Sequence, residues 1–321
     1  MQISANVVVA VVLPAYNEER TIEETIHAFH AALPSAAIWV VNNSSTDATE
    51  SLARKTLLAL DCSGGVLNED RKGKGQAVRR AFLEIDADIY LLADADMTYP
   101  AERARDLMSP VIEGRADMVV GDRHSAGYYA AENKRPLHGF GNRLVRYLVN
   151  HLFDAQLSDI MSGYRALSRR FVKNYPILVK GFEIETDMTL HALDKRFRII
   201  EIQVEYRNRQ EGSVSKLNTF SDGAKVLFVI MQILRYYRPL VFFGSLSLFF
   251  GLTGLLVAIP VAQDWIESQY IYHVPLAILA TGLEIVAVMT LGIGMILDSI
   301  GYQQRREYEK QILNNRSKFT R

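Results

Sequence analysis

Residues 7–19 read VVVAVVLPAYNEE, an apolar run rich in β-branched residues that stops at a proline and a polar loop. An uninterrupted apolar run such as residues 7–13 is typical of a strand that is buried on both faces of a sheet. The residues TIEE at 21–24 match a capping box, and we expect the helix that it opens to extend through Leu33. The chain thus begins with a strand, a polar loop and a helix.

The same alternation continues up to residue 121. Further strands are expected at 38–41, 89–93 and 118–120, and further helices at 44–60 and within the glycine-studded segment 71–85. Alternating strands and helices favour an α/β domain with a Rossmann-like, mostly parallel sheet, which we place at residues 1–221. In such sheets ligands bind beyond the carboxyl ends of the strands. The loops after the strands are therefore where chemistry is expected.

These loops are unusually polar. They read PAYNEE at 14–19, NNSSTD at 42–47, DAD at 94–96 and GDR at 121–123. Asp94 and Asp96 would repel one another unless a cation neutralised them, and carboxylate oxygens suit Mg²⁺ or Mn²⁺. Such an ion could also carry the pyrophosphate of a nucleotide. Because an isolated Asp-x-Asp is more often a solvated turn, this hypothesis depends on the other strand ends pointing to the same place.

The glycines at 73 and 75 raise the alternative of a dinucleotide-binding oxidoreductase. GKGQAV at 73–78 nearly matches G-x-G-x-x-G, but a valine stands at the third glycine and the motif does not follow the first strand. We reject that alternative. The glycines instead let a loop approach the start of a helix, where Lys72 and Lys74 either lie near an anionic ligand or are solvated.

Composition excludes several classes of protein. The chain has 36 basic and 36 acidic residues, whereas nucleic-acid binders need a surplus of Lys and Arg. Its one cysteine, Cys62, excludes an intramolecular disulfide and a cysteine-based zinc cluster. We therefore expect no nucleic-acid partner and no zinc module.

Two long apolar runs follow the α/β domain. Residues 240–262 carry no charge, and residues 274–297 carry one, Glu284. Since a helix of roughly 20 residues crosses the hydrocarbon of a bilayer, we expect a transmembrane hairpin over 240–297 rather than two buried core helices. Glu284 is costly inside a membrane and should face the other helix or a neighbouring subunit, which makes a homo-oligomer one candidate assembly.

The charges that flank the hairpin predict its orientation. The basic residues at its open end are Arg235, Arg238, Arg305, Arg306 and Lys310, whereas the connecting loop has Asp264 and Glu267 and no Lys or Arg. The positive-inside rule places both termini and the α/β domain in the cytoplasm, with a basic tail at 298–321. We therefore expect an integral protein of the cytoplasmic membrane. Residues 222–239 are expected to form an amphipathic helix, which either lies in the membrane interface or packs on the soluble domain.

Taken together, the motifs resemble a known family. PAYNE at 14–18, NNSSTD at 42–47, KGKG at 72–75 and DAD at 94–96 are similar to the inverting family-2 glycosyltransferases of GT-A fold. The hairpin and four later segments, GDR at 121–123, SGYR at 162–165, FEIE at 182–185 and RQEGSVSK at 209–216, narrow the resemblance. They resemble the polyprenyl-phosphate glycosyltransferases, the group that includes dolichyl-phosphate mannose and glucose synthases. The resemblance covers nearly the whole chain.

This resemblance implies a GT-A catalytic domain that binds a nucleotide-sugar and Mg²⁺ or Mn²⁺. Pro14, Tyr16, Glu18 and Asn43 would contact the base and ribose, Lys74, Asp94 and Ala95 would complete the nucleotide site, and Asp94 and Asp96 would serve the metal. The family usually has DDGSTD at the second strand end, where this chain has NNSSTD. An asparagine carbonyl can still accept a hydrogen bond from a uracil N–H, and we expect a UDP-linked donor. Thr98 stands where some members place a glutamine ligand.

The acceptor side can be argued from its charge. A lipid monophosphate is mostly ionised near neutral pH, because its second pKa is about 6, so it needs no strong general base. It does need cations that offset its repulsion from the donor's phosphates. By the resemblance, Arg123, Arg135, Arg209 and Lys216 would provide them, and Ser162, Glu183 and Glu185 would contact acceptor or sugar. Asp159 matches the position often proposed as the base in the family. Because the phosphate is already ionised, we expect Asp159 to orient groups or bind the sugar rather than abstract a proton.

We therefore expect inverting, metal-dependent transfer of a single sugar from a nucleotide-sugar to undecaprenyl or dolichyl phosphate at the cytoplasmic face of the membrane. One alternative is a membrane-tethered protein that binds nucleotide-sugars without turnover. Another is a processive polysaccharide synthase, but such enzymes carry Q-x-x-R-W and more spans, and neither Trp39 nor Trp265 lies in that context.

Overall fold

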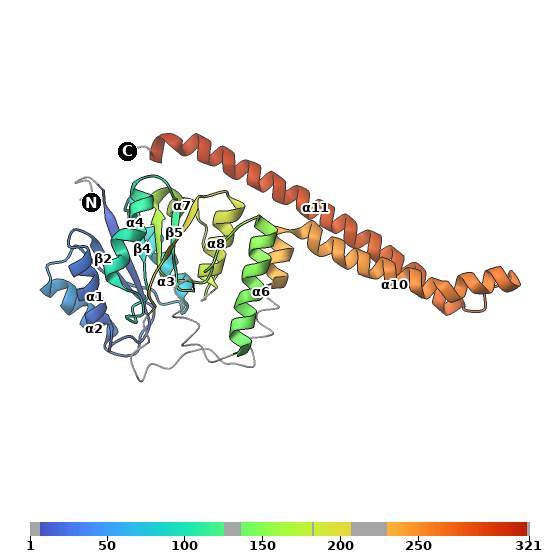
Figure 1. Cartoon of the computed structure of the whole chain (residues 1–321), viewed down its shortest axis with the longest axis horizontal. Helices are drawn as coiled ribbons and strands as arrows, with labels where there is room; N and C mark the ends of the chain where they lie inside the picture. Colours follow the sequence, from blue (N-terminus) through green and yellow to red (C-terminus); the bar gives the residue numbers. More distant parts are fainter. Residues whose placement is uncertain (1–6, 125–135, 182, 207–229, 320–321) are drawn as a thin grey trace. The chain divides into compact units, whose positions relative to one another are not determined.

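The computed structural model describes residues 7–124, 136–181, 183–206 and 230–319 (Figure 1). The chain divides into two compact units, residues 1–218 and residues 219–321. The first unit alternates strands and helices, and the second contains two long apolar helices.

Within the described residues, the first unit is built on a seven-stranded sheet with the order β3-β2-β1-β4-β6-β5-β7. Its strands are β1 (Val9–Ala15), β2 (Ala37–Asn42), β3 (Gly64–Asn68), β4 (Ile89–Leu92), β5 (Met118–Asp122), β6 (Arg165–Ser168) and β7 (Ile199–Gln203). β1 pairs in parallel with β2 and β4, β2 with β3, and β5 with β7, whereas β6 runs antiparallel to β4 and β5. The expected α/β fold with a mostly parallel sheet is confirmed.

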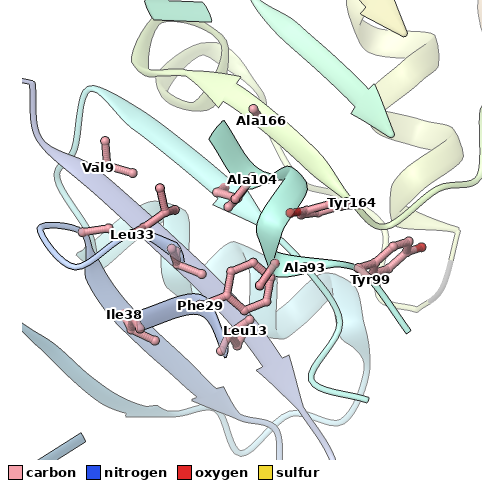
Figure 2. Packing of buried hydrophobic residues seen from close by; sticks show 14 of the residues in the cluster. Val9, Leu13, Phe29, Leu33, Ile38, Ala93, Tyr99, Ala104, Tyr164 and Ala166 are labelled. Carbon is pink, nitrogen blue, oxygen red and sulfur yellow. The ribbon is translucent and has the colours of Figure 1, made fainter. Parts of the chain in front are cut away.

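Helices pack against both faces of this sheet. The described helices of the first unit are α1 (Ile22–Ala32), α2 (Thr49–Ala59), α3 (Lys74–Glu84), η1 (Ala101–Arg103), α4 (Ala104–Ile112), α6 (Pro136–Phe153), α7 (Arg169–Asn174) and α8 (Ile184–Asp194). On one face, Leu13 of β1 packs in a core cluster with Phe29 of α1, whose ring meets Tyr164 edge-on (Figure 2). On the other face, Val12 is equally buried, and α3 contacts β1 and β2. β1 is therefore covered on both faces, as its uninterrupted apolar run predicts.

The helix α1 starts where the sequence predicts, but the predicted capping box does not form. The side chain of Thr21 makes no capping hydrogen bond at the start of α1. Its hydroxyl instead donates to the main-chain oxygen of Ala95 at 2.8 Å, and Thr25, one turn later, donates to the same oxygen at 3.2 Å. The threonine thus ties the start of α1 to the DAD loop after β4.

The second unit contains α10 (Pro239–Ser268) and α11 (Val274–Phe319). Both helices are long and apolar enough to cross a membrane, and only 6% and 11% of their most apolar windows are buried. Core helices of a soluble protein would be mostly covered, so these helices are consistent with the expected hairpin. α11 continues without a break through residues 298–319 of the segment expected to form the basic tail.

Polar and small residues line the contact between the two helices. Ser247 Oγ donates to the main-chain oxygen of Ala287 at 2.7 Å. Glu284 faces α10, because a Cβ added at Gly254 would lie 2.7 Å from its Oε1. Of the expected interfacial helix, residues 230–237 are helical, and residues 222–229 lie outside the described part of the chain. Its position in a membrane interface stays a prediction.

Candidate active site

The carboxyl ends of β1, β2, β4 and β5 lie at one edge of the sheet, because the antiparallel β6 between β4 and β5 leaves those two strands parallel. The loops after these strands carry the PAYNEE, NNSSTD, DAD and GDR segments. Asn17, Ser44 and Met97, in three of these loops, have positive φ angles of 54°, 57° and 61°. Because ligands bind beyond the carboxyl ends of the strands in sheets of this kind, this edge is the candidate site.

The loops after β1 and β2 are joined by hydrogen bonds. Asn17 Oδ1 accepts from the Thr46 N–H at 2.8 Å, and the Glu18 N–H donates to Thr49 Oγ1 at 2.8 Å. Three of the predicted nucleotide ligands lie in this joined region and are half-buried: Pro14, Tyr16 and Glu18. The Lys72 ammonium lies over the Tyr16 ring, 5.8 Å from its centroid.

Asn43, the predicted uracil contact, has partners within the chain. Its side-chain oxygen accepts from the Gly73 N–H at 2.7 Å, and its amide nitrogen donates to the main-chain oxygens of Glu69 and Arg71 at 3.2 and 2.7 Å. The residue is 5% exposed. In this structure Asn43 braces the loop before α3, and the oxygen expected to meet a uracil N–H is already bonded.

Lys74 is buried between two carboxylates rather than solvated. Its ammonium pairs with Asp94 Oδ1 and, at 2.5 Å, with Glu185 Oε1, and its side chain is 8% exposed. Burial by itself lowers the pKa of Lys74, but the charges of Asp94 and Glu185 outweigh that effect and hold the pKa above its usual value. The lysine therefore stays charged and links the end of β4 to the start of α8.

The glycines of KGKG allow the main chain at the start of α3 to lie close to the main chain at residues 179–180. The Gly75 N–H donates to the Lys180 oxygen at 3.1 Å, and a Cβ on Gly75 would lie 2.4 Å from the Val179 oxygen. Gly73, with φ of 128°, also lies against Lys180. Because these residues are glycines, the start of α3 can lie directly against the segment before α8. This close approach places Lys74 within reach of Glu185.

The two acids of the FEIE segment have different surroundings. Glu185 is bound to Lys74 and lies in the first turn of α8. Glu183 precedes α8, and its Oε1 accepts from the Gly181 N–H at 3.1 Å. Of these two predicted sugar contacts, Glu185 is thus joined to Asp94 through Lys74, whereas the Glu183 side chain bonds the main chain two residues before it.

Hydrogen bonds hold the DAD loop in place. Asp96 is 4% exposed, and its Oδ1 accepts from the N–H and the hydroxyl of Thr98 at 3.2 and 2.5 Å. The main-chain oxygen of Ala95 accepts from the hydroxyls of Thr21, just before α1, and Thr25, within it. Thr98, at the position of a family glutamine ligand, here supports Asp96. Asp94 lies against Gly163 of the SGYR segment, where a Cβ would be 3.0 Å from Asp94 Oδ2.

The donor set at this loop fits a hard divalent cation. Among the described residues, no three His, Cys, Asp or Glu side chains form a complete metal site. Mg²⁺ and similar ions are, however, commonly held by one or two carboxylates together with substrate phosphates. Asp94 and Asp96 offer the two carboxylates, and oxygen ligands suit Mg²⁺ or Mn²⁺.

Arg123 and Asp159 form a buried bidentate pair. Arg123 Nε donates to Asp159 Oδ2 at 2.7 Å and its terminal nitrogen donates to Oδ1 at 3.0 Å, while the Arg123 N–H also reaches Oδ2 at 3.2 Å. Burial raises the pKa of Asp159, but the neighbouring guanidinium prevails and holds it below its usual value. A carboxylate with a lowered pKa is a weak base, which fits an orienting role better than proton abstraction.

The other predicted acceptor residues divide into two groups. Ser162 is fully buried, and its Oγ accepts from the Tyr164 N–H at 3.3 Å. Arg135, Arg209 and Lys216 lie outside the described residues. Their roles stay predictions.

Two residues that support the site were not predicted from the sequence. Arg165 is fully buried and donates to the main-chain oxygens of Ile160 and Ser162 at 2.9 and 2.8 Å. Glu201 accepts from the N–H groups of Ser158 and Asp159. For Glu201 the available signal was an acid between isoleucines in the apolar run IIEIQ at 199–203, and Arg165 is the last residue of the SGYR segment.

Comparison with known proteins agrees with this geometry. The sequence model of glycosyl transferase family 2 matches residues 10–175. The chain is 30% identical over 305 residues to glycosyltransferase AglJ of Haloferax volcanii, covering 95% of this chain and 97% of that protein. It is 29% identical over 231 residues to an undecaprenyl-phosphate mannosyltransferase of Micrococcus luteus, covering 69% and 92%.

A solved structure shares the fold. The glucosyl-3-phosphoglycerate synthase of Mycobacterium tuberculosis superposes with a TM-score of 0.55 at 24% identity, covering 72% of this chain and 78% of that one. This likeness supports the GT-A fold, and the family match spans β1 to α7, including the PAYNE, NNSSTD and DAD loops. The chain is therefore a glycosyltransferase that belongs to glycosyl transferase family 2.

Proposed function

We propose that this glycosyltransferase moves one sugar from a nucleotide-sugar onto a polyprenyl phosphate, with inversion at the anomeric carbon. We propose that the donor is UDP-linked. The observation that carries the proposal is the meeting of two kinds of group at one sheet edge. Carboxylates stand at the end of β4, and a buried arginine–aspartate pair follows β5. The name of the Micrococcus relative, an undecaprenyl-phosphate mannosyltransferase, supports this acceptor class.

On the donor side, Asp94 and Asp96 would hold the divalent cation. When bound, the cation would stabilise the charge of the departing nucleoside diphosphate. Lys74 pairs with Asp94 and fixes its carboxylate in place, and Thr98 orients Asp96. Pro14, Tyr16 and Glu18 would receive the nucleoside, and Asn43 shapes that site by bracing the loop before α3. The Mycobacterium synthase of the same fold was crystallised with Mn²⁺ and UDP.

On the acceptor side, an ionised phosphate oxygen would attack the anomeric carbon as the bond to the pyrophosphate oxygen breaks. No proton must be removed from the nucleophile, because the monophosphate is already largely ionised at neutral pH. Arg123 would donate a charge-assisted hydrogen bond to this anion. Asp159 would keep the guanidinium in place. A single displacement of this kind inverts the anomeric centre.

The two apolar helices support a membrane location, where a polyprenyl phosphate would be found. We further propose that the α/β domain and both termini face the cytoplasm, as the basic residues that flank the hairpin predict.

The test is a transfer assay with the full-length protein in detergent micelles. Undecaprenyl phosphate and a panel of radiolabelled UDP- and GDP-sugars are supplied, with and without EDTA. We expect a radiolabelled lipid from one donor, and its loss in EDTA with recovery on adding Mg²⁺ or Mn²⁺. Transfer that persists in EDTA would contradict the metal role of Asp94 and Asp96. Nucleotide binding without any lipid product would favour the binding-protein alternative.

A further inference from the structure

Glu201 is an acid in the middle of β7, with an isoleucine on each side. Its carboxylate accepts hydrogen bonds from two consecutive main-chain N–H groups. The Ser158 N–H reaches its two oxygens at 2.9 and 2.7 Å, and the Asp159 N–H reaches one of them at 2.8 Å. Glu201 therefore holds the main chain at the residue whose side chain grips Arg123.

The same short segment is also held by α6. Asn150 bonds Leu157 in both directions, with its amide donating to the main-chain oxygen at 2.9 Å and its oxygen accepting from the N–H at 3.0 Å. Arg146 donates to the main-chain oxygen of Ser158 at 3.2 Å. Residues 157–159 are thus fixed from two elements, and Glu201 supplies the contacts from the sheet.

An ionised carboxylate is energetically unfavourable at position 201. Burial raises the pKa of Glu201, the two N–H groups oppose that rise, and the negative charges of Asp122 and Asp159 add to it. An acid in these surroundings is poorly explained by stability alone, because ionised groups resist burial near like charges. It is explained by geometry, since only a carboxylate offers two acceptor oxygens to adjacent N–H donors, with charge-assisted bonds.

We propose that Glu201 is a positioning residue for the transfer reaction, which fixes Asp159 and, through it, the guanidinium of Arg123 that meets the acceptor phosphate. This inference rests on the proposed function. Glu201 has no described hydrogen bond to the DAD loop or to Lys74, so its effect should fall on the acceptor side and spare the nucleotide site.

The test compares Glu201→Gln and Glu201→Asp with the control Glu205→Gln, all in the full-length protein in micelles. Glu205 lies just beyond the same strand and is exposed. Three quantities are measured: kcat and KM for undecaprenyl phosphate, the affinity for UDP, and hydrogen exchange of the main chain at residues 157–163. Thermal unfolding of each variant is recorded alongside.

For Glu201→Gln we expect kcat/KM for undecaprenyl phosphate to fall by up to about 100-fold, because small misplacements of catalytic groups have effects of this size. UDP affinity should stay at the wild-type value, and exchange at residues 158 and 159 should accelerate, because the amide nitrogen of glutamine would face an N–H donor. Glu201→Asp, which keeps both oxygens, should recover part of the activity. Glu205→Gln should match the wild type.

Two results would overturn the inference. One is a Glu201→Gln variant that matches Glu205→Gln in kinetics and exchange. The other is a parallel loss of acceptor use, UDP affinity and thermal stability, which would indicate a merely structural role. If the wild type transfers no sugar from any donor, the proposed function fails, and the exchange rates alone decide whether Glu201 anchors the segment.

Discussion

Lys74 is the cation on which two acids of the candidate site depend. The substitution Lys74→Met keeps most of the side-chain volume but leaves Asp94 and Glu185 without their shared partner. Removing one member of a buried ion pair costs about 3–5 kcal/mol, because the remaining charges stay desolvated. We expect a loss of this order in the free energy of unfolding, measured by chemical unfolding in micelles, together with weaker nucleotide binding.

The matched control is Lys55→Met, because Lys55 is exposed on α2. It should change the unfolding free energy by less than about 0.5 kcal/mol, as surface substitutions usually do. Equal stability of the two variants would mean that Lys74 does not hold the two carboxylates in solution.

His191 gives the α/β domain a pH-dependent stability. It is 8% exposed and packs among aromatic rings, including those of Phe171 and Tyr175. Burial, and then the charge of Lys195, lower its pKa from 6.5 to about 4. The unfolded chain therefore takes up the proton first as the pH falls, and we expect His191 alone to lower the stability by about 3 kcal/mol between about pH 6.5 and pH 4.

His191→Phe removes the titrating group and keeps a ring in the cluster. Its unfolding free energy should fall less steeply than that of the wild type over the same acidic interval, by chemical unfolding at a series of pH values. Parallel curves for the two proteins would contradict the prediction.

Single residues also show how far a sequence can predict a site. Asp94, Asp96 and Arg123 follow strands that the apolar pattern marks clearly, so their loops could be placed at one sheet edge in advance. The partners of Asn43 and the pairing of Lys74 with Glu185 could not, because they come from residues 69–73 and from α8, which approach only when the sheet and its helices have packed.

At the scale of elements, the start of α3 depends on a main-chain contact with no room for a side chain. A Cβ on Gly75 would lie 2.4 Å from the Val179 oxygen, and a main-chain atom cannot move aside cheaply. Gly75→Ala should therefore lower the free energy of unfolding by about 1–3 kcal/mol, the usual range for overpacking, and shift Lys74 away from Glu185. Thermal unfolding and the transfer assay measure the two effects.

Gly65→Ala on β3 is the control, since its Cβ would make an ordinary contact of 3.7 Å with the Trp39 ring. A Gly75→Ala variant as stable and active as Gly65→Ala would show that the two main chains are not so close in solution.

The strands differ in how visible they are in the sequence. β1, β2, β4 and β5 are continuous apolar runs, and each was predicted. β3, β6 and β7 were not, for local reasons. β3 opens with two glycines, β6 begins with the buried Arg165, and β7 carries Glu201 at its centre. Because β6 and β7 contain charged residues, a search for apolar runs does not detect them. The same two residues, Arg165 and Glu201, hold the segment 158–162 in place.

At the scale of the whole molecule, the division into an α/β unit and an apolar hairpin could be predicted from the distribution of apolar and charged residues along the chain. A span of apolar residues long enough for a bilayer is a stronger signal than any single strand, because it depends on length and charge rather than on packing. This distribution did not predict that α11 continues as one helix beyond residue 297, through Phe319.

The last prediction concerns the orientation of that hairpin. The native Cys62 is the chain's one cysteine, so Cys62→Ser gives a background without thiols. Single cysteines are then introduced by Gln269→Cys at the end of α10 and by Gln303→Cys in α11 beyond the second apolar run. Intact cells are treated with a membrane-impermeant maleimide before and after permeabilisation. Because basic residues flank only the open end of the hairpin, position 269 should react in intact cells and position 303 only after permeabilisation. The reverse pattern would place the α/β domain outside the cytoplasm, away from cytoplasmic nucleotide-sugars, and would remove the basis for transfer at the inner face.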